Sequence, residues 1–255
     1  MRSVDRSLLL TFQPGSATAS RTPTAAATLP AAVLWDMDGT LIDTEPYWMS
    51  AETELVEAHG GVWTREDALG MVGSSMAVCA RTLRSRGVAL PDEEISGFLN
   101  ARVAAGVAAG IPWQPGAREL LDELVAAGVP LALVTSSFAV LAEPFARAVG
   151  VFDVVVSGDE VAHPKPHPEP YLTAAARLGV DVRDCVAVED SRSGIASAHA
   201  SGARTLAVQL IAPVEPLDGV SITGSLRAVS LDVLAGMVAG HVVDLRGEGA
   251  PVTEG

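Results

Sequence analysis

The chain has 255 residues, of which 49% are hydrophobic and 19% charged, as expected of one large globular domain or of a domain with an insertion. Its formal net charge of −14 argues against nucleic acid and anionic membranes as partners, because their phosphates would be repelled. No apolar run has the length of a membrane span, and two separated cysteines, Cys79 and Cys185, make neither a disulfide framework nor a zinc site, so we expect a cytoplasmic protein.

The first organised stretch follows a tail without periodicity. Residues 1–30 are rich in alanine, threonine, serine and proline, which predicts disorder. Residues 31–35 form a short apolar run that predicts a buried parallel strand, and it leads directly into Asp36, Asp38 and Gly39. Ligands of open α/β sheets bind beyond the carboxyl ends of strands, so we expect both aspartates at the mouth of a site.

The following region, 46–112, has a helical pattern throughout. Pro46 can open a first helix, and glycines at suitable positions end the later ones. The expected helices cover 47–58, 64–72, 75–86 and 92–110. This region is therefore predicted to be a helical insertion between the first strand and the rest of a sheet.

Strands and helices then alternate. Strands are expected over 129–134, 152–156, 184–188 and 203–208, and helices over 116–127, 139–149, 168–178 and 193–200. Repeated units of this size predict an α/β fold with a doubly wound parallel sheet. We expect a core domain of residues 31–45 and 113–240, with Ile222 and 229–237 at its periphery, and a loose C-terminal tail over 241–255.

Polar clusters stand at or shortly after the ends of four predicted strands. They are Asp36 with Asp38, Thr135, Lys165, and Glu189 with Asp190. In a parallel sheet these strand ends meet at one edge, so the four clusters are expected to form one site. Lys165 is the only lysine of the chain and is flanked by prolines that stiffen its loop, which favours a functional role over a solvated surface position.

The predicted chemistry is phosphoryl transfer. A carboxylate nucleophile that approaches a phosphate dianion meets a repulsion of ~4 kcal/mol per charge pair at about 4 Å in a partly shielded site. A Mg²⁺ ion held by oxygens of Asp36, Asp38 and Asp190 would offset this charge, and Lys165 would add to the effect. The Thr135 hydroxyl and nearby backbone amides can hold phosphoryl oxygens.

The same stretches resemble the four motifs of the haloacid dehalogenase (HAD) superfamily. Residues 34–41 resemble its first motif, 133–137 its second, 164–166 its third and 186–195 its fourth. The motifs occur in the family's order, and the resemblance covers about residues 31–236. The helical region 46–112 is similar to the cap of the β-phosphoglucomutase-like branch of this superfamily.

This resemblance implies a role for each matching residue. Asp36 would be the nucleophile that forms an aspartyl-phosphate, and Asp38 the general acid for the leaving alcohol and then the base for water. Thr135 would bind the transferring phosphoryl group, and Lys165 would orient Asp36 and offset charge. The second aspartate of the first motif argues against a dehalogenase, because the dehalogenases of the family lack it.

Metal and substrate residues follow from the same resemblance. The implied cofactor is Mg²⁺, with Asp36, Asp38, Glu189 and Asp190 as its ligands, Glu189 either directly or through water. The expected substrate-binding residues are Thr44, Glu45, Gly73, Ser74, Ser75 and Ser136. The group at 73–75 is included because relatives aim a loop of the cap at the substrate.

Three functions remain open at this point. The first is a Mg²⁺-dependent phosphatase that hydrolyses a small phosphorylated metabolite such as a sugar phosphate. The second is a sugar-phosphate mutase, which must hold a bisphosphate by both ends, although region 46–112 contains no lysine. The third is a non-catalytic phosphoacceptor or binding module like a signalling receiver domain, which is much smaller and does not need Asp38 as an acid.

Overall fold

The computed structural model describes residues 28–209 and 217–247. The tail expected over 1–30 lies outside the described residues except for its last three, of which Leu29 packs against the main hydrophobic core. Residues 248–255 of the expected C-terminal tail lie outside them as well. Within the described ranges, no helix combines the length and the apolar character needed to cross a membrane.

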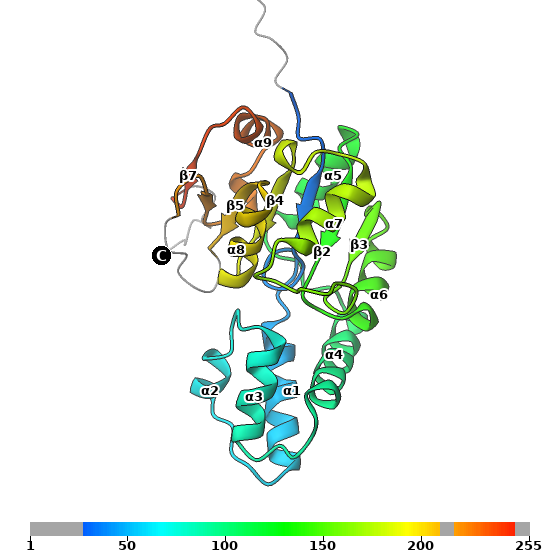
Figure 1. Cartoon of the computed structure of the whole chain (residues 1–255), viewed down its shortest axis with the longest axis vertical. Coiled ribbons are helices and arrows are strands. Elements are labelled where there is room, and N and C mark those ends of the chain that lie inside the picture. Colours follow the sequence, from blue (N-terminus) through cyan, green and yellow to red (C-terminus); the bar gives the residue numbers. More distant parts are fainter. Residues whose placement is uncertain (1–27, 210–216, 248–255) are drawn as a thin grey trace, which may run out of the picture.

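A seven-stranded parallel sheet forms the centre of the structure (Figure 1). Its strands are β1 (Val33–Trp35), β2 (Leu131–Val134), β3 (Val154–Val156), β4 (Val186–Glu189), β5 (Arg204–Val208), β6 (Ser221–Thr223) and β7 (Asp244–Leu245). Their order is β3-β2-β1-β4-β5-β6-β7, and every neighbouring pair is parallel. The predicted doubly wound α/β fold is therefore confirmed, with β1 between β2 and β4.

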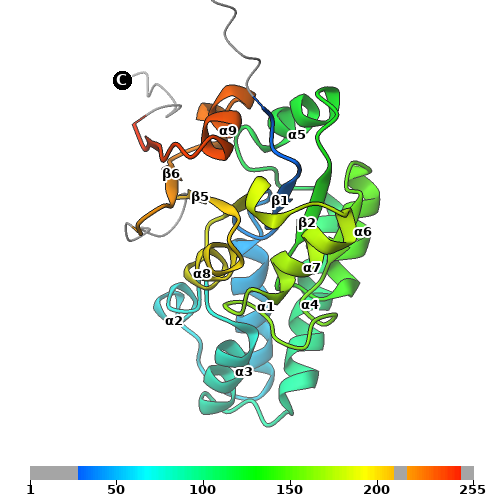
Figure 2. The ribbon, with the colours of Figure 1, turned by 45° about the horizontal axis from the view of Figure 1, so that its top comes forward.

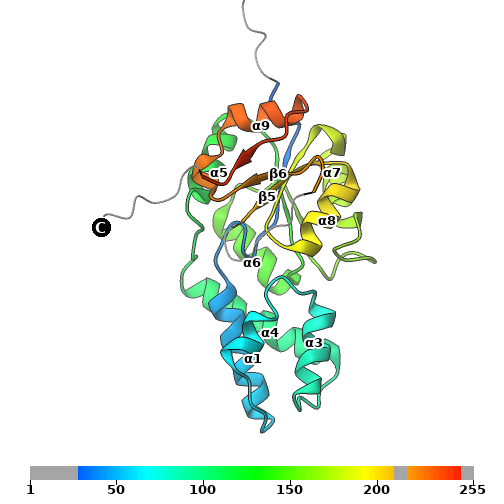
Figure 3. The ribbon, with the colours of Figure 1, turned by 90° about the vertical axis from the view of Figure 1, so that its left-hand side faces the viewer.

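Helices cover both faces of this sheet (Figure 3). On one face lie α5 (Ala117–Ala126), α6 (Ala139–Val149) and α9 (Leu231–Val238), and on the other α7 (Glu169–Leu178) and α8 (Arg192–Ser201). Two short 3₁₀ turns, η1 (Val182–Asp184) and η2 (Leu226–Ala228), lie in the connections.

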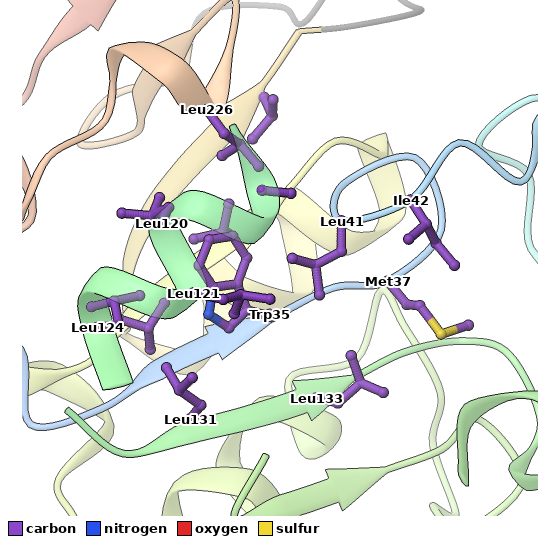
Figure 4. Close-up of a cluster of buried hydrophobic side chains, with 14 of the residues drawn as sticks. Trp35, Met37, Leu41, Ile42, Leu120, Leu121, Leu124, Leu131, Leu133 and Leu226 are labelled. Carbon is purple, nitrogen blue, oxygen red and sulfur yellow. The ribbon is translucent and has the colours of Figure 1, made fainter. Parts of the chain in front are cut away.

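The core is built by the two-residue alternation of the buried strands. Trp35 points to the face of α5, where Leu121 and Leu131 surround it (Figure 4), whereas its neighbour Leu34 belongs to the cluster on the face of α7. All of these side chains are almost completely buried. Because both faces are apolar, the strands read as continuous hydrophobic runs, and this made them visible in the sequence.

The helical insertion lies beyond the carboxyl edge of the sheet (Figure 2). It consists of α1 (Glu45–Ala58), α2 (Arg65–Leu69), α3 (Met76–Ser85) and α4 (Asp92–Ala109). Leu55, Leu83 and Leu99 belong to a separate hydrophobic cluster inside it. Helix α4 packs against both α1 and α6, so it joins the insertion to the sheet domain.

The C-terminal part of the fold differs from the expectation. Residues 229–237 were expected at the periphery, but Leu234 and Met237 of α9 are buried in the main core. The tail expected from residue 241 contains β7, and the Ile222 amide of β6 donates to the Val243 carbonyl at 2.9 Å. β7 has only two residues, which is too short for a periodic pattern in the sequence.

Candidate active site

The carboxyl ends of four neighbouring strands gather the motif residues at the edge that faces the insertion. Asp36 follows β1, Thr135 follows β2, and Glu189 ends β4 with Asp190 next to it. Lys165 comes from the loop between β3 and α7. The clusters that the sequence placed at separate strand ends therefore meet in one place.

Lys165 is the buried centre of this site. Its ammonium donates to Asp36 Oδ1 at 2.7 Å, to Glu189 Oε1 at 2.5 Å and to the Val134 carbonyl at 2.8 Å. Although burial lowers the pKa of Lys165, the Asp36 and Glu189 carboxylates raise it above its usual range, so the side chain stays charged. Tyr171 of α7 is a second donor to the same oxygen, since its hydroxyl donates to Glu189 Oε1 at 2.8 Å.

One ammonium does not neutralise the carboxylates around it. Oxygens of Asp36, Glu189 and Asp190 all lie within 4.8 Å of one another. Burial and the charge of Glu189 raise the pKa of Asp36 to about 8, against the opposite effect of Lys165. Burial and the charge of Asp36 raise the pKa of Asp190 well above its usual range. The cluster thus carries excess negative charge that a cation would relieve.

The oxygen atoms in this cluster suit a hard cation such as Mg²⁺. Asp36 Oδ1 accepts from Lys165 and Asp190 Oδ1 from the Thr40 hydroxyl at 3.0 Å, which leaves the second oxygen of each aspartate free of hydrogen bonds to the described residues. Glu189 differs, because its Oε2 accepts the backbone amides of Asp190 and Ser191 at 3.1 and 3.3 Å. We infer that Asp36 and Asp190 are the side chains fitted to a metal, while Glu189 positions Lys165.

Gly39 is required for this close approach of the first and fourth motifs. A Cβ atom at this position would lie 2.1 Å from Asp190 Oδ2, and the backbone φ of +84° is one that favours glycine. A side chain at this position would therefore displace the Asp190 carboxyl from its place in the site.

Asp38 points in a different direction from the metal-fitted cluster. Its Oδ1 accepts the Thr44 hydroxyl at 2.6 Å and the Trp48 indole N–H at 3.3 Å. Its Oδ2 accepts the Ser137 hydroxyl at 2.7 Å and, more weakly, that of Thr135 at 3.4 Å. The Asp38 carboxyl is therefore fixed from both sides, and it is absent from the group of neighbouring carboxylates that the structure brings together around Asp36.

A pocket opens between the sheet edge and the insertion, and both contribute to its walls. Of the expected substrate-binding residues, Glu45, Gly73, Ser74 and Ser136 line it. Thr44 and Ser75 do not. Thr44 is fully buried against Asp38, and Ser75 caps α3 by accepting the Val78 amide at 3.4 Å.

Several pocket residues were not anticipated from the sequence. They are Trp48, Glu52, Met71, Met76, Cys79, Ser137, Ser191 and Ser193. A signal for two of them was available, because Glu45, Trp48 and Glu52 are spaced three and seven residues apart and so share one face of α1. Tyr171, which reaches Glu189 from behind, carried no signal that distinguishes it from a core aromatic residue.

Comparison with known proteins places this geometry in a family. Residues 30–202 match a family model described as haloacid dehalogenase-like hydrolase. The chain is 35% identical to protein CbbY of Rhodobacter capsulatus over 190 residues, which cover 69% of this chain and 83% of that protein. It is 31% identical to hexitol phosphatase A of Escherichia coli, with coverages of 74% and 88%.

A solved structure supports the same assignment to this family. The fold resembles that of a CbbY mutant from Rhodobacter sphaeroides in complex with xylulose-1,5-bisphosphate, with a TM-score of 0.72 and 30% identity. The similarity covers 81% of this chain and 99% of that one.

The buried cation leads to a stability prediction. Replacing Lys165 by Met in metal-free protein should lower the free energy of unfolding by about 3–5 kcal/mol at pH 8, because carboxylates lose their buried partner. The loss should shrink at pH 5. An acid whose pKa is higher in the folded than in the unfolded state stabilises the fold when protonated, and this stability disappears as the pH rises. Urea unfolding at both pH values measures the difference.

The matched control is Arg147→Met. Arg147 pairs with Glu143 at 3.2 Å on the exposed face of α6, so this variant should lose less than about 1 kcal/mol at either pH. An equal loss at pH 5 and pH 8 for Lys165→Met would show that the lysine does not balance the carboxylate cluster.

Proposed function

This chain belongs to the haloacid dehalogenase-like hydrolases, and we propose that it is a Mg²⁺-dependent phosphatase that hydrolyses a small phosphorylated metabolite through an aspartyl-phosphate on Asp36. The observation that carries the proposal is the buried contact of Asp36 with Lys165, beside an Asp190 carboxyl whose second oxygen has no hydrogen bond to the described residues. The name of hexitol phosphatase A supports a sugar or polyol phosphate as substrate.

Asp36 acts as the nucleophile in this proposal. Lys165 donates to its Oδ1, which fixes the orientation of the carboxyl group, so that one carboxyl oxygen would attack phosphorus while the other would bind the metal. The hydroxyls of Thr135 and Ser136 lie at the end of the neighbouring strand and can bind phosphoryl oxygens. A Mg²⁺ ion on Asp36 and Asp190 would neutralise part of the negative charge of the phosphoryl group.

Asp38 is the proposed general acid and base. In its acid form it gives a proton to the leaving alcohol, and the resulting carboxylate then takes a proton from the water that attacks the aspartyl-phosphate. The Thr44 and Ser137 hydroxyls fix the carboxyl at 2.6 and 2.7 Å, which keeps it beside the reacting atoms without tying it to the metal. Attack on phosphorus and proton transfer are therefore assigned to two different carboxyl groups, those of Asp36 and Asp38.

We propose that helices α1 to α4 serve as a cap over the site, with the boundaries 46–112 inferred from the sequence. Helices α1 and α3, together with the loop between α2 and α3, supply half of the residues that line the pocket, including Glu45, Glu52 and Ser74. Excluding bulk water while the ester is cleaved would strengthen the electrostatic interactions of the phosphoryl group with the sheet edge.

Metal removal tests the charge argument. Activity on p-nitrophenyl phosphate should fall to background in excess EDTA and return on addition of Mg²⁺, because the Asp36 and Asp190 carboxylates would otherwise repel the substrate. Asp190→Asn should raise the Mg²⁺ concentration for half-maximal activity by roughly 10-fold or more. The exposed Asp122→Asn should leave it unchanged. Full activity of the wild-type protein in EDTA would rule out the metal-dependent mechanism.

The acid role of Asp38 predicts a dependence on the leaving group. Asp38→Asn should slow turnover of an alkyl phosphate such as glycerol 3-phosphate by about 10²–10⁴-fold, since a poor leaving group needs a proton. The loss in single-turnover cleavage should be clearly smaller for p-nitrophenyl phosphate, whose phenolate leaves without one. Equal losses of cleavage rate on both esters would contradict the assignment.

A further inference from the structure

The wall of the pocket is acidic. Five of its lining residues carry a carboxyl group, namely Asp36, Asp38, Glu45, Glu52 and Asp190. Among the described residues that line it, none is a lysine, arginine or histidine. Lys165 contacts Asp36 and is only 4% exposed. Its positive charge therefore acts at the end of the pocket near Asp36, where the phosphoryl group would bind.

The cap side of the pocket is acidic through Glu45 and Glu52 of α1. Glu52 is 4% exposed, and its two oxygens are fixed by the Trp63 indole N–H at 3.2 Å and by the Cys79 thiol at 3.5 Å. Burial raises the pKa of Glu52 to about 7. Burial and the charge of Asp38 raise the pKa of Glu45 to about 7 as well. Both carboxyls already stand in an environment that disfavours more negative charge.

The cations of the cap do not compensate for this. Arg84, Arg86 and Arg102 form ion pairs with Asp92, Asp67 and Glu54, and all three arginines are about half exposed. The remaining cap arginines, Arg65 and Arg81, are exposed and do not line the pocket. Arg192 stands between the pocket residues Ser191 and Ser193, but its own side chain is exposed and is not part of the wall.

On the basis of the phosphatase function proposed above, we propose that the substrate is a phosphomonoester whose remaining part is neutral and hydroxylated, and that Glu52 and Glu45 exclude compounds with a second anionic group. A second phosphate or a carboxylate would be placed near two carboxyl groups, and the described residues that line the pocket offer no cation to pair with it. A sugar or polyol monophosphate meets no such repulsion. Specificity would arise from a repulsive element in the cap as much as from attraction.

Hydroxyl groups of a substrate also fit these walls. A carboxyl group with a raised pKa can accept a hydrogen bond from a hydroxyl as a carboxylate, or donate one to it after taking up a proton. The hydroxyls of Ser74, Ser136 and Ser193 line the same pocket and offer the same two-way bonding. Trp48 and Met76 add apolar surface for the carbon chain.

Matched substrates that differ at one carbon test this inference. Glucitol 6-phosphate, 6-phosphogluconate and 1-amino-1-deoxyglucitol 6-phosphate end in a hydroxyl, a carboxylate and an ammonium group. Glycerol 3-phosphate and 3-phosphoglycerate repeat the first pair with three carbons. We expect kcat/KM for the hydroxyl compound to exceed that for the carboxylate compound by roughly 100-fold in the six-carbon series, the three-carbon series or both. A close contact between like charges has an effect of about this size.

Variants then assign the discrimination to particular residues. Glu52→Gln should reduce the preference for hydroxyl over carboxylate by roughly tenfold, because it keeps hydrogen bonding but removes a charge. Glu45→Gln provides the same readout if Glu52→Gln does not fold. Glu57→Gln, the same change on an exposed position of α1, should leave the preference unchanged, and so should Arg192→Ala.

The outcomes separate the two proposals. Without turnover of p-nitrophenyl phosphate by the Mg²⁺-loaded protein, the phosphatase function itself fails. If the protein does turn over p-nitrophenyl phosphate, a kcat/KM for the carboxylate compounds that equals or exceeds that for the hydroxyl compounds overturns the inference. A kcat/KM for the ammonium compound more than tenfold above that for the hydroxyl compound overturns it as well. A preference for the hydroxyl compounds that persists unchanged in both glutamine variants would show that Glu45 and Glu52 do not cause it.

Discussion

The ion pair between Lys165 and Asp36 is the contact on which the rest of the site depends. Three carboxyl groups lie within 4.8 Å of one another at the end of the sheet, and Lys165 is the cation that the fold places among them. The parallel order of β3, β2, β1 and β4 makes this possible, because it aligns the carboxyl ends of strands that are far apart in sequence. Glu189 accepts hydrogen bonds from both Lys165 and Tyr171, and Gly39 lets Asp190 approach closely.

The remaining negative charge links the structure to the proposed chemistry. Asp36 has a pKa raised to about 8, so its ionised form requires more positive charge than Lys165 provides. A metal on Asp36 and Asp190 would supply this charge and would also offset the negative charge of a phosphoryl group bound beside them. Away from the end where the phosphoryl group would bind, Glu45 and Glu52 make the pocket wall acidic. This agrees with the net charge of −14. The same arrangement that favours one phosphate would disfavour a second.

The parts of the fold and site that the sequence predicted are those with strong local signals. The runs around Val33 and Val186 are continuously apolar because both sheet faces are covered, and the motif residues follow these runs directly. Residues joined only by the tertiary fold escaped prediction: Tyr171 of α7 reaches Glu189 at the end of β4, and β7 pairs with β6 through backbone hydrogen bonds. The direction of the Asp38 carboxyl also depends on Thr44 and Ser137, which no spacing rule relates to it.

Trapping the covalent intermediate tests the central claim most directly. Protein turning over a phosphomonoester in Mg²⁺ is quenched in acid within milliseconds, and reduction with borohydride then converts an aspartyl-phosphate into homoserine, which peptide mass spectrometry locates. The account predicts this conversion at Asp36 during turnover, with none in protein quenched without substrate. Turnover with no conversion at Asp36, or with conversion at another carboxyl group instead, would contradict it.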